Sequence, residues 1–268
     1  MTLQSWYRIM WCMKINKVKH FWELLWGMTE KELRARYKYT LFGFLWLVAN
    51  PILQMLVIGF VFTFFMKEPV NHYYYFLFIG LLVWNFFSLS LSKATPSIVF
   101  ERSLIKKAYF PRAVIPLSII FSNLVHFTFA FLLFLIPILF LGTLTIATFP
   151  YVIGAIGFLI LFTSGVSLLT CALNVRFRDV NFFVQAILML WFYATPIVYS
   201  LAQMPPRLLW LWRFNPMTSI LQLFQHALLG APAPGPAMLA SNTAVMIIIT
   251  ALGILVFRDE SKTFDDWV

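Results

Sequence analysis

Few residues of this chain have the type and spacing that an active site requires. Its 268 residues include ten Asp and Glu, four His and two Cys. Cys12 and Cys171 are not at a metal-binding spacing, and no two carboxylates form a recognisable acid–base pair. None of the eleven glycines precedes a lysine, so the chain lacks the phosphate-binding loop of ATPases. The sequence therefore predicts no catalytic residue, and no metal or cofactor bound by this chain.

Basic residues dominate the charged ones, because 20 Lys and Arg against ten acids give a net charge of +10. In a soluble protein this excess would suggest a nucleic-acid partner. Here, however, 61% of the residues are hydrophobic and 11% are charged, against roughly 45–50% and 25% in soluble domains. The composition excludes a soluble enzyme. It predicts an all-α polytopic membrane protein with no nucleic-acid partner.

Six segments without Asp, Glu, Lys or Arg approach or exceed the ~20 residues that cross a bilayer as a helix. They are residues 41–66, 73–92, 113–141, 150–173, 182–200 and 237–257. We therefore expect a six-span membrane domain over residues 41–258. An interfacial region, 1–40, precedes it, and a short tail, 259–268, follows it.

The basic residues predict how this domain is oriented. All but three of the 20 Lys and Arg lie in residues 1–40, 93–112, 174–181 and 258–268. The alternate loops hold only Lys67, Arg207 and Arg213. Because basic loops stay in the cytoplasm, both termini are expected inside, with the basic segments close to membrane lipids.

The six spans contain almost no group that could bind a coupling ion. Transporters driven by ions place ionisable side chains at membrane depth. The one titratable candidate is His126, and its neighbour Asn123 is more typical of a helix-packing contact. Energy for transport is therefore expected to come from a partner.

The segment before the first span predicts an amphipathic helix over residues 17–40. Its apolar stripe consists of Phe21, Leu24, Leu25 and Met28. A capping box from Thr29 to Glu32 predicts that a second helix starts at Thr29. The segment is either an interfacial anchor or a cytoplasmic collar that touches a partner.

A second polar helix is expected over residues 96–110, between spans two and three. Thr95 is its expected cap, Pro96 its first residue, and Pro111 ends it at Phe110. Fifteen residues with a mixed apolar and basic surface exceed what a connection needs. The helix either lies solvated at the headgroups or docks into a soluble subunit.

Two further features concern the path through the membrane. Residues 201–236 predict two short helices broken at Asn215–Pro216, which re-enter the outer membrane edge and suit a lid or gate. In span one, Pro51 predicts a kink beside Asn50 and Gln54, whose amides could face a partner helix or a pore.

Several motifs together resemble the ABC-2 type permeases that export bacterial polysaccharides such as O-antigen, teichoic acid and capsule. They are Leu33-Arg34-Ala35-Arg36-Tyr37-Lys38, Leu41-Phe42-Gly43-Phe44-Leu45-Trp46, Asn50-Pro51, Phe110-Pro111-Arg112, Asn174-Val175-Arg176-Phe177-Arg178-Asp179-Val180, Pro196-Ile197-Val198-Tyr199-Ser200 and Asn215-Pro216. The resemblance covers about residues 18–258.

The resemblance implies half of a transporter of the bacterial inner membrane. Two such permeases pair, and two copies of a separate ATPase dock beneath them and hold the ATP and Mg²⁺. The family's coupling helix falls on residues 96–110. The resemblance therefore implies that the residues coupling this chain to the ATPase are Glu101, Arg102, Leu104, Ile105, Lys106, Lys107 and Tyr109.

The same resemblance implies where a glycan on a polyprenyl pyrophosphate, or on another lipid, would pass. Its phosphate headgroup would meet the chain at Arg34, Arg36 and Lys38. The alternative is that these residues only anchor the chain to anionic lipid. The candidates for lumen lining are Tyr37, Trp46, Asn50 and Gln54. The candidates for the outer gate are Leu208, Asn215, Pro216, Leu221 and Phe224.

The sequence thus favours the permease subunit of an exporter of lipid-linked polysaccharide. One alternative keeps the ABC-2 architecture but exports a small hydrophobic drug or lipid. Another, a membrane-embedded glycan enzyme, needs a catalytic acid or base near the bilayer surface. Glu101 and Asp179 on the inner side and Glu68 on the outer side form no such pair, which argues against an enzyme.

Overall fold

The computed structural model describes residues 3–38, 45–65, 72–107, 110–143, 145–205, 207 and 209–267. Every regular element in these ranges is a helix, in agreement with the expected all-α class. In chain order they are α1 (Leu3–Tyr37), α2 (Trp46–Phe65), α3 (Tyr73–Ala94), α4 (Ser97–Phe100), α5 (Arg102–Lys107), α6 (Val114–Leu141), α7 (Phe149–Arg176), α8 (Val180–Ala194), the 3₁₀ turn η2 (Leu201–Gln203), α9 (Leu209–Trp212), α10 (Pro216–Leu229), α11 (Pro236–Glu260) and α12 (Phe264–Trp267).

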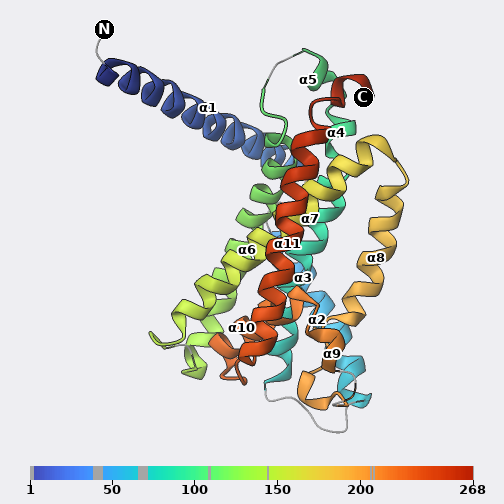
Figure 1. Ribbon diagram of the computed structural model, residues 1–268. Helices are drawn as coiled ribbons and strands as arrows, with labels where there is room; N and C mark the ends of the chain where they lie inside the picture. Colours follow the sequence, from blue (N-terminus) through green and yellow to red (C-terminus); the bar gives the residue numbers. More distant parts are fainter. Residues whose placement is uncertain are drawn as a thin grey trace.

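The long helices form one bundle with two different ends (Figure 1). The short helices α4 and α5 and the C-terminus lie at one end, and α1 projects away from the bundle there. Most Lys and Arg belong to these segments, so we call it the basic end. Helices α9 and α10 lie at the opposite end.

Within the described residues, four helices, α3, α6, α7 and α11, are long and apolar enough to cross a membrane, with mean hydropathy between 1.7 and 2.6 over their most apolar 18 residues. They correspond to the predicted spans at 73–92, 113–141, 150–173 and 237–257. The described apolar helices over 48–64 and 180–194 are shorter. The structure therefore supports a polytopic membrane protein, and the count of six spans stays a prediction.

The predicted span at 182–200 extends too far. Helix α8 ends at Ala194, and Thr195 has an extended backbone with φ −108° and ψ 138°. Pro196 disfavours helical geometry at the residue before it, which explains this end. The Thr195 hydroxyl donates to the Trp191 carbonyl at 2.8 Å, so the last turn of α8 is closed locally.

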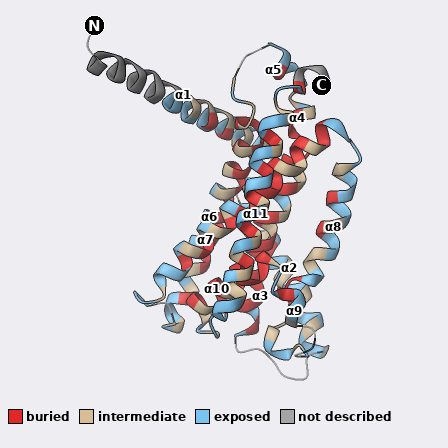
Figure 2. Cartoon of the chain, in the orientation of Figure 1, coloured by how far each residue is buried: buried red, intermediate tan, exposed pale blue. Residues whose placement is uncertain are grey.

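The interior of the bundle is built around α3, most of whose residues are buried (Figure 2). Phe87 of α3 stacks on Phe162 of α7, with ring centroids 5.5 Å apart and planes at 8°. Trp191 of α8 meets Phe87 edge-on at 5.2 Å. Large apolar side chains on α2 and α8, such as Phe60 and Phe182, are instead exposed, as suits contact with lipid or another helix.

Helix α1 is continuous from Leu3 to Tyr37, so the second helix start predicted at Thr29 is wrong. The Thr29 side chain is buried and its hydroxyl donates to the Leu25 carbonyl at 2.7 Å, one turn back within the same helix. The apolar stripe around Leu25 packs on α6, and Trp22 meets Phe121 edge-on at 6.1 Å. This packing continues past Thr29 and overrides the local capping signal.

The single helix predicted over 96–110 is also wrong. Thr95 ends α3, since its backbone N–H donates to Leu91 at 3.0 Å, and α4 begins only at Ser97 with Pro96 at its cap. The chain turns at Glu101, and α5 ends at Lys107. The turn brings the Glu101 carboxylate to Lys31 of α1 at 2.6 Å.

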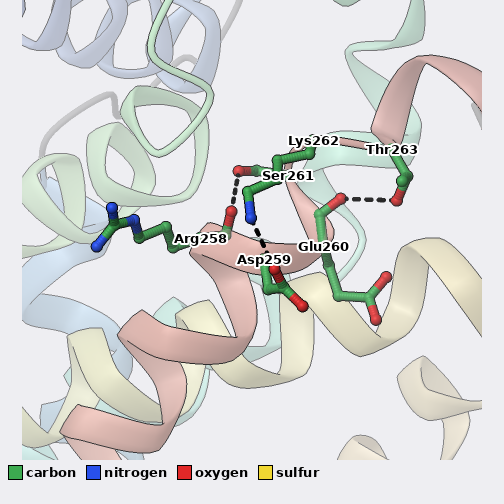
Figure 3. A network of polar contacts seen from close by, with 6 residues as sticks. All are labelled: Arg258, Asp259, Glu260, Ser261, Lys262 and Thr263. Atoms are coloured by element: carbon green, nitrogen blue, oxygen red, sulfur yellow. Dashed lines mark hydrogen bonds and ion pairs between the residues drawn. The ribbon is translucent and has the colours of Figure 1, made fainter.

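The segment expected as a tail, 259–268, is folded as far as Trp267. Figure 3 shows three contacts that close the end of α11: Ser261 Oγ to the Arg258 carbonyl at 2.9 Å, Lys262 Nζ to Asp259 at 2.8 Å, and Thr263 Oγ1 to the Glu260 carbonyl at 3.0 Å. Beyond them, Phe264 is buried. Its ring meets Phe257 edge-on at 5.5 Å.

Helices α7 and α11 cross in close contact at Gly165 and Gly253. A Cβ placed on Gly165 would lie 2.5 Å from Thr250 Cα, and one on Gly253 would overlap the Gly165 carbonyl. The Thr250 hydroxyl donates to the Leu161 carbonyl at 3.2 Å across the same contact. Small residues at a crossing let two backbones touch, as is common in membrane helices.

We predict that Gly165→Ala destabilises the protein by ~1–3 kcal/mol, because the added methyl must push α11 away. The control is Gly157→Ala on the same helix, where a Cβ meets nothing within 4 Å and better helix propensity leaves stability unchanged or slightly higher. Thermal unfolding of both variants in detergent measures the difference. Equal Tm values would contradict the tight crossing.

Candidate functional site

Seven polar side chains from four helices line one cavity of about 280 Å³. They are Arg36 of α1, Asn50 of α2, Asn85, Ser88 and Ser92 of α3, and Asn123 and His126 of α6. Trp46, Pro51 and Phe86 belong to its apolar walls. We call this cavity the polar pocket. It lies in the half of the bundle nearer the basic end, since it involves the end of α1 and the start of α2.

Arg36 connects α1 to the wall of the polar pocket. Its Nη2 donates to Asn123 Oδ1 at 2.8 Å, and its Nη1 contacts His126 Nδ1. Asn123 Nδ2 in turn donates to Ser90 Oγ of α3 at 3.0 Å. Because a guanidinium only donates, His126 must present an unprotonated Nδ1 in this contact. The network holds a positive charge beside a set of neutral polar groups.

Three of the four residues predicted to line a lumen can be placed at this pocket. Trp46 and Asn50 line it, and Gln54 accepts a hydrogen bond from Asn85 Nδ2 at 3.0 Å. That bond ties α2 to α3 one turn beyond the buried Pro51. Tyr37 is the last residue of α1. Its side chain lies outside the described residues.

The three basic residues predicted to meet a headgroup do not lie at one place. Arg34 is exposed and pairs with Glu30 on its own helix at 2.5 Å. Lys38 is also exposed. Only Arg36 lines the polar pocket. Successive positions along α1 point in different directions, so a basic run in the sequence becomes one inward and two outward charges.

The polar face of α3 was missed by sequence reasoning. Asn85, Ser88 and Ser92 follow one another at intervals of three and four residues, which places them on one side of a helix. This spacing within an otherwise apolar segment was a visible signal. Asn123 and His126 show the same interval on α6, and their interpretation as a helix-packing contact omitted the Arg36 partner.

The residues predicted to couple to an ATPase divide into an inward and an outward set. Ile105 is 5% exposed and packs with Ile98, Phe257 and Phe264 in a cluster at the basic end. Leu104 and Glu101 are half-buried, and Arg102, Lys106 and Lys107 are exposed. Tyr109 lies outside the described residues. The apolar set fixes α4 and α5 to the bundle and leaves a basic surface outside.

Glu101 also links this surface to α1. Its pair with Lys31 is partly buried on the glutamate side, and Arg36 follows Lys31 on the same helix after five residues, about 7.5 Å of helical rise. Helix α1 therefore contacts the turn between α4 and α5 at Lys31 and lines the polar pocket at Arg36.

At the opposite end, Asn215 begins α10 as predicted. Its Oδ1 accepts from the Met217 N–H at 3.2 Å and from Trp191 Nε1 at 3.0 Å, and Pro216 occupies the first turn. Leu221 and Phe224 of α10 are fully buried, and Phe224 meets Phe131 edge-on at 5.7 Å. Leu208 lies outside the described residues. Whether these residues form a gate stays a prediction.

A family model described as ABC-2 type transporter matches residues 23–229, which include the polar pocket, α4, α5 and α10. The chain belongs to the ABC-2 type transporter family. Membership confirms the resemblance drawn from the motifs. It also implies an ATPase partner, because ABC-2 proteins are membrane components of ABC transport systems.

Within the ABC-2 family, the chain is similar to three permeases of O-antigen export systems. Two are O-antigen export system permease proteins RfbA of Klebsiella pneumoniae, 35% and 34% identical, covering 81% and 78% of this chain and 85% and 81% of the relatives. A protein of the same name from Myxococcus xanthus is 31% identical over 93% of this chain and 97% of its own length. All three are thus named as permease proteins of O-antigen export systems.

We predict that Arg36→Met lowers the stability of this ABC-2 protein by ~1–3 kcal/mol, because Asn123 and His126 lose a charged donor at a half-buried site. Arg34→Met is the control on the same helix, where an exposed pair contributes little. Thermal unfolding in detergent compares the two variants. A larger loss of Tm in Arg34→Met would contradict the assigned roles.

Proposed function

We propose that this chain is the transmembrane subunit of an ATP-driven exporter that moves a lipid-linked, O-antigen-like glycan from the cytoplasm across the bacterial inner membrane. The observation that carries the proposal is the match to O-antigen export permeases over most of the chain. In the assembly two copies of the chain pair, and two copies of a separate ATPase provide the sites for ATP and Mg²⁺.

The proposed orientation places the basic end in the cytoplasm, with both termini. Its support is the distribution of Lys and Arg, of which all but three belong to the segments 1–40, 93–112, 174–181 and 258–268. The ATPase then docks on the exposed face of α4 and α5, where Arg102, Lys106 and Lys107 lie.

The headgroup of the substrate is received at the polar pocket. A guanidinium binds two phosphate oxygens with parallel hydrogen bonds. In the free protein, Asn123 and His126 hold Arg36 in a position that a phosphate could take over. The neutral amides and hydroxyls of Asn50, Asn85 and Ser88 then face the first sugar. Arg34 and Lys38 attract anionic headgroups to the surface nearby.

Helix α1 transmits the movement of the ATPase to the polar pocket. The ATPase displaces α4 and α5, Lys31 follows Glu101, and α1 carries Arg36 with it. Release of the headgroup is thereby coupled to ATP hydrolysis. The two-state element is the position of α1 on α6, which both the phosphate and the ATPase bias.

Co-purification with the ATPase tests the proposal, followed by ATPase assays in lipid with and without lipid-linked glycan. We expect a stable assembly with two copies of each subunit whose ATPase rate rises with the glycan. Stimulation only by small hydrophobic compounds would favour the alternative of a drug or lipid exporter. Failure to assemble with any ATPase would contradict the proposal.

We predict that Lys106→Glu and Lys107→Glu, combined with Leu104→Asp, abolish glycan-stimulated ATP hydrolysis and export while the permease still inserts, because the basic docking face is inverted. The matched control is Arg207→Glu with Arg213→Glu, two exposed charge reversals at the opposite end. Unchanged export in the Lys106 and Lys107 variant, measured as surface glycan, would contradict the assigned coupling surface.

A further inference from the structure

A second hollow, of about 560 Å³, lies at the opposite end of the bundle. This volume is within the ~300–1,000 Å³ of small-ligand sites. Its walls come from the start of α3, the turn after α8, the second half of α10 and the start of α11. Phe76, Ser200, Gln222, Gln225, Pro232 and Met238 are among its lining residues. We call it the amide pocket, after the two glutamines.

The two glutamines carry buried polar atoms that nothing satisfies. Within the described part of the chain, Gln222 Oε1 and Gln225 Nε2 have no hydrogen-bond partner, and Gln225 is 5% exposed. Both residues line the pocket, three positions apart on α10 and hence on one face of it. Buried amides are almost always paired in folded proteins. An unmet acceptor and an unmet donor on one face of α10 therefore point to a ligand that completes them.

The side chains that line the amide pocket indicate which kind of ligand fits it. Gln222 Oε1 needs a donor and Gln225 Nε2 needs an acceptor, and a hydroxyl group can be either. The Ser200 oxygen accepts from the Ala202 N–H at 3.3 Å, so its own hydroxyl proton can still be donated. None of the described residues that line the pocket is charged, which disfavours an ionic ligand. Phe76 and Met238 add an apolar wall that suits the C–H face of a sugar ring.

The pocket is held in shape without a ligand. Gly230 ends α10 in the left-handed region, with φ 67°. His226 Nδ1 hydrogen-bonds the Ala231 carbonyl at 2.7 Å, and Thr143 Oγ1 donates to the Leu228 carbonyl at 2.5 Å. These contacts fix the turn that forms one wall, so a ligand need not order it.

We propose that the amide pocket binds one neutral pyranose unit, between the side chains of Gln222 and Gln225 and the apolar wall formed by Phe76 and Met238. The choice of a sugar from an exported glycan rests on the proposed function, whereas the unmet amides do not. At this end of the bundle the site holds a sugar of the emerging chain, and it opposes backward movement of the glycan between ATPase cycles.

Saturation-transfer NMR on the purified full-length chain in lipid nanodiscs tests this binding directly. The probes are the methyl glycosides of glucose, galactose and mannose at millimolar concentration. We expect transfer to the ring protons of at least one glycoside with the unaltered chain. Gln222→Leu combined with Gln225→Leu should weaken its binding about tenfold or more, because two hydrogen bonds are lost. Gln203→Leu, an exposed amide in η2 outside the pocket, should leave binding unchanged.

Thermal unfolding of the same variants separates a binding role from a structural one. Because the two amide atoms have no hydrogen-bond partner among the described residues, the double Leu variant should keep the Tm of the unaltered chain. The proposal is wrong if none of the glycosides shows transfer, if Gln203→Leu loses as much binding as the double variant, or if the double variant loses stability together with binding.

This result is independent of the ATPase. If the glycosides bind but lipid-linked glycan never stimulates ATP hydrolysis, the proposed function fails and the sugar site stands. If the glycan stimulates hydrolysis and the glycosides do not bind, the amide pocket is not a sugar site and the exporter proposal stands.

Discussion

The contact of Arg36 with Asn123 and His126 is the interaction around which the polar part of this protein is arranged. Hydrocarbon offers polar groups no partner, so such groups must satisfy one another inside the bundle. A charged donor at this depth is strengthened by its surroundings and costly to leave unpaired. It fixes the end of α1 on α6, closes the polar pocket, and sets the position from which Lys31 meets Glu101. Helix α1 thus contacts both the polar pocket and the turn beside the proposed coupling surface of α4 and α5.

The long apolar helices could be predicted from the sequence because each contains a run without charges. Among the described residues, α3, α6, α7 and α11 are long and apolar enough to cross a membrane, and the six-span arrangement stays a prediction. Asn215–Pro216 also marked the start of α10 correctly. The errors arose where a local signal competed with packing. The capping box at Thr29 is overridden by the contact of α1 with α6, and the helix over 96–110 breaks where Glu101 meets Lys31. The end of α8 could have been predicted from Pro196, which disfavours helical geometry at Thr195.

The candidate sites were harder to predict because they depend on which side of a helix faces a neighbour. Arg34, Arg36 and Lys38 look equivalent in the sequence, yet only Arg36 lines a cavity. The stripe of Asn85, Ser88 and Ser92 was visible, but its partners come from three other helices. Gln222 and Gln225 illustrate the same limit, since their spacing is ordinary and only the hollow beside them, with their unmet amide atoms, suggests a site.

In the proposed mechanism Arg36, rather than the basic surface around it, receives the charged group of the substrate. A cryo-electron microscopy structure of the chain with its ATPase and bound lipid-linked glycan would locate this group. We expect the phosphate within hydrogen-bond distance of the Arg36 guanidinium inside the polar pocket, with the His126 contact displaced. A phosphate held by Arg34 or Lys38 at the surface, with Arg36 still bonded to Asn123 and His126, would contradict it.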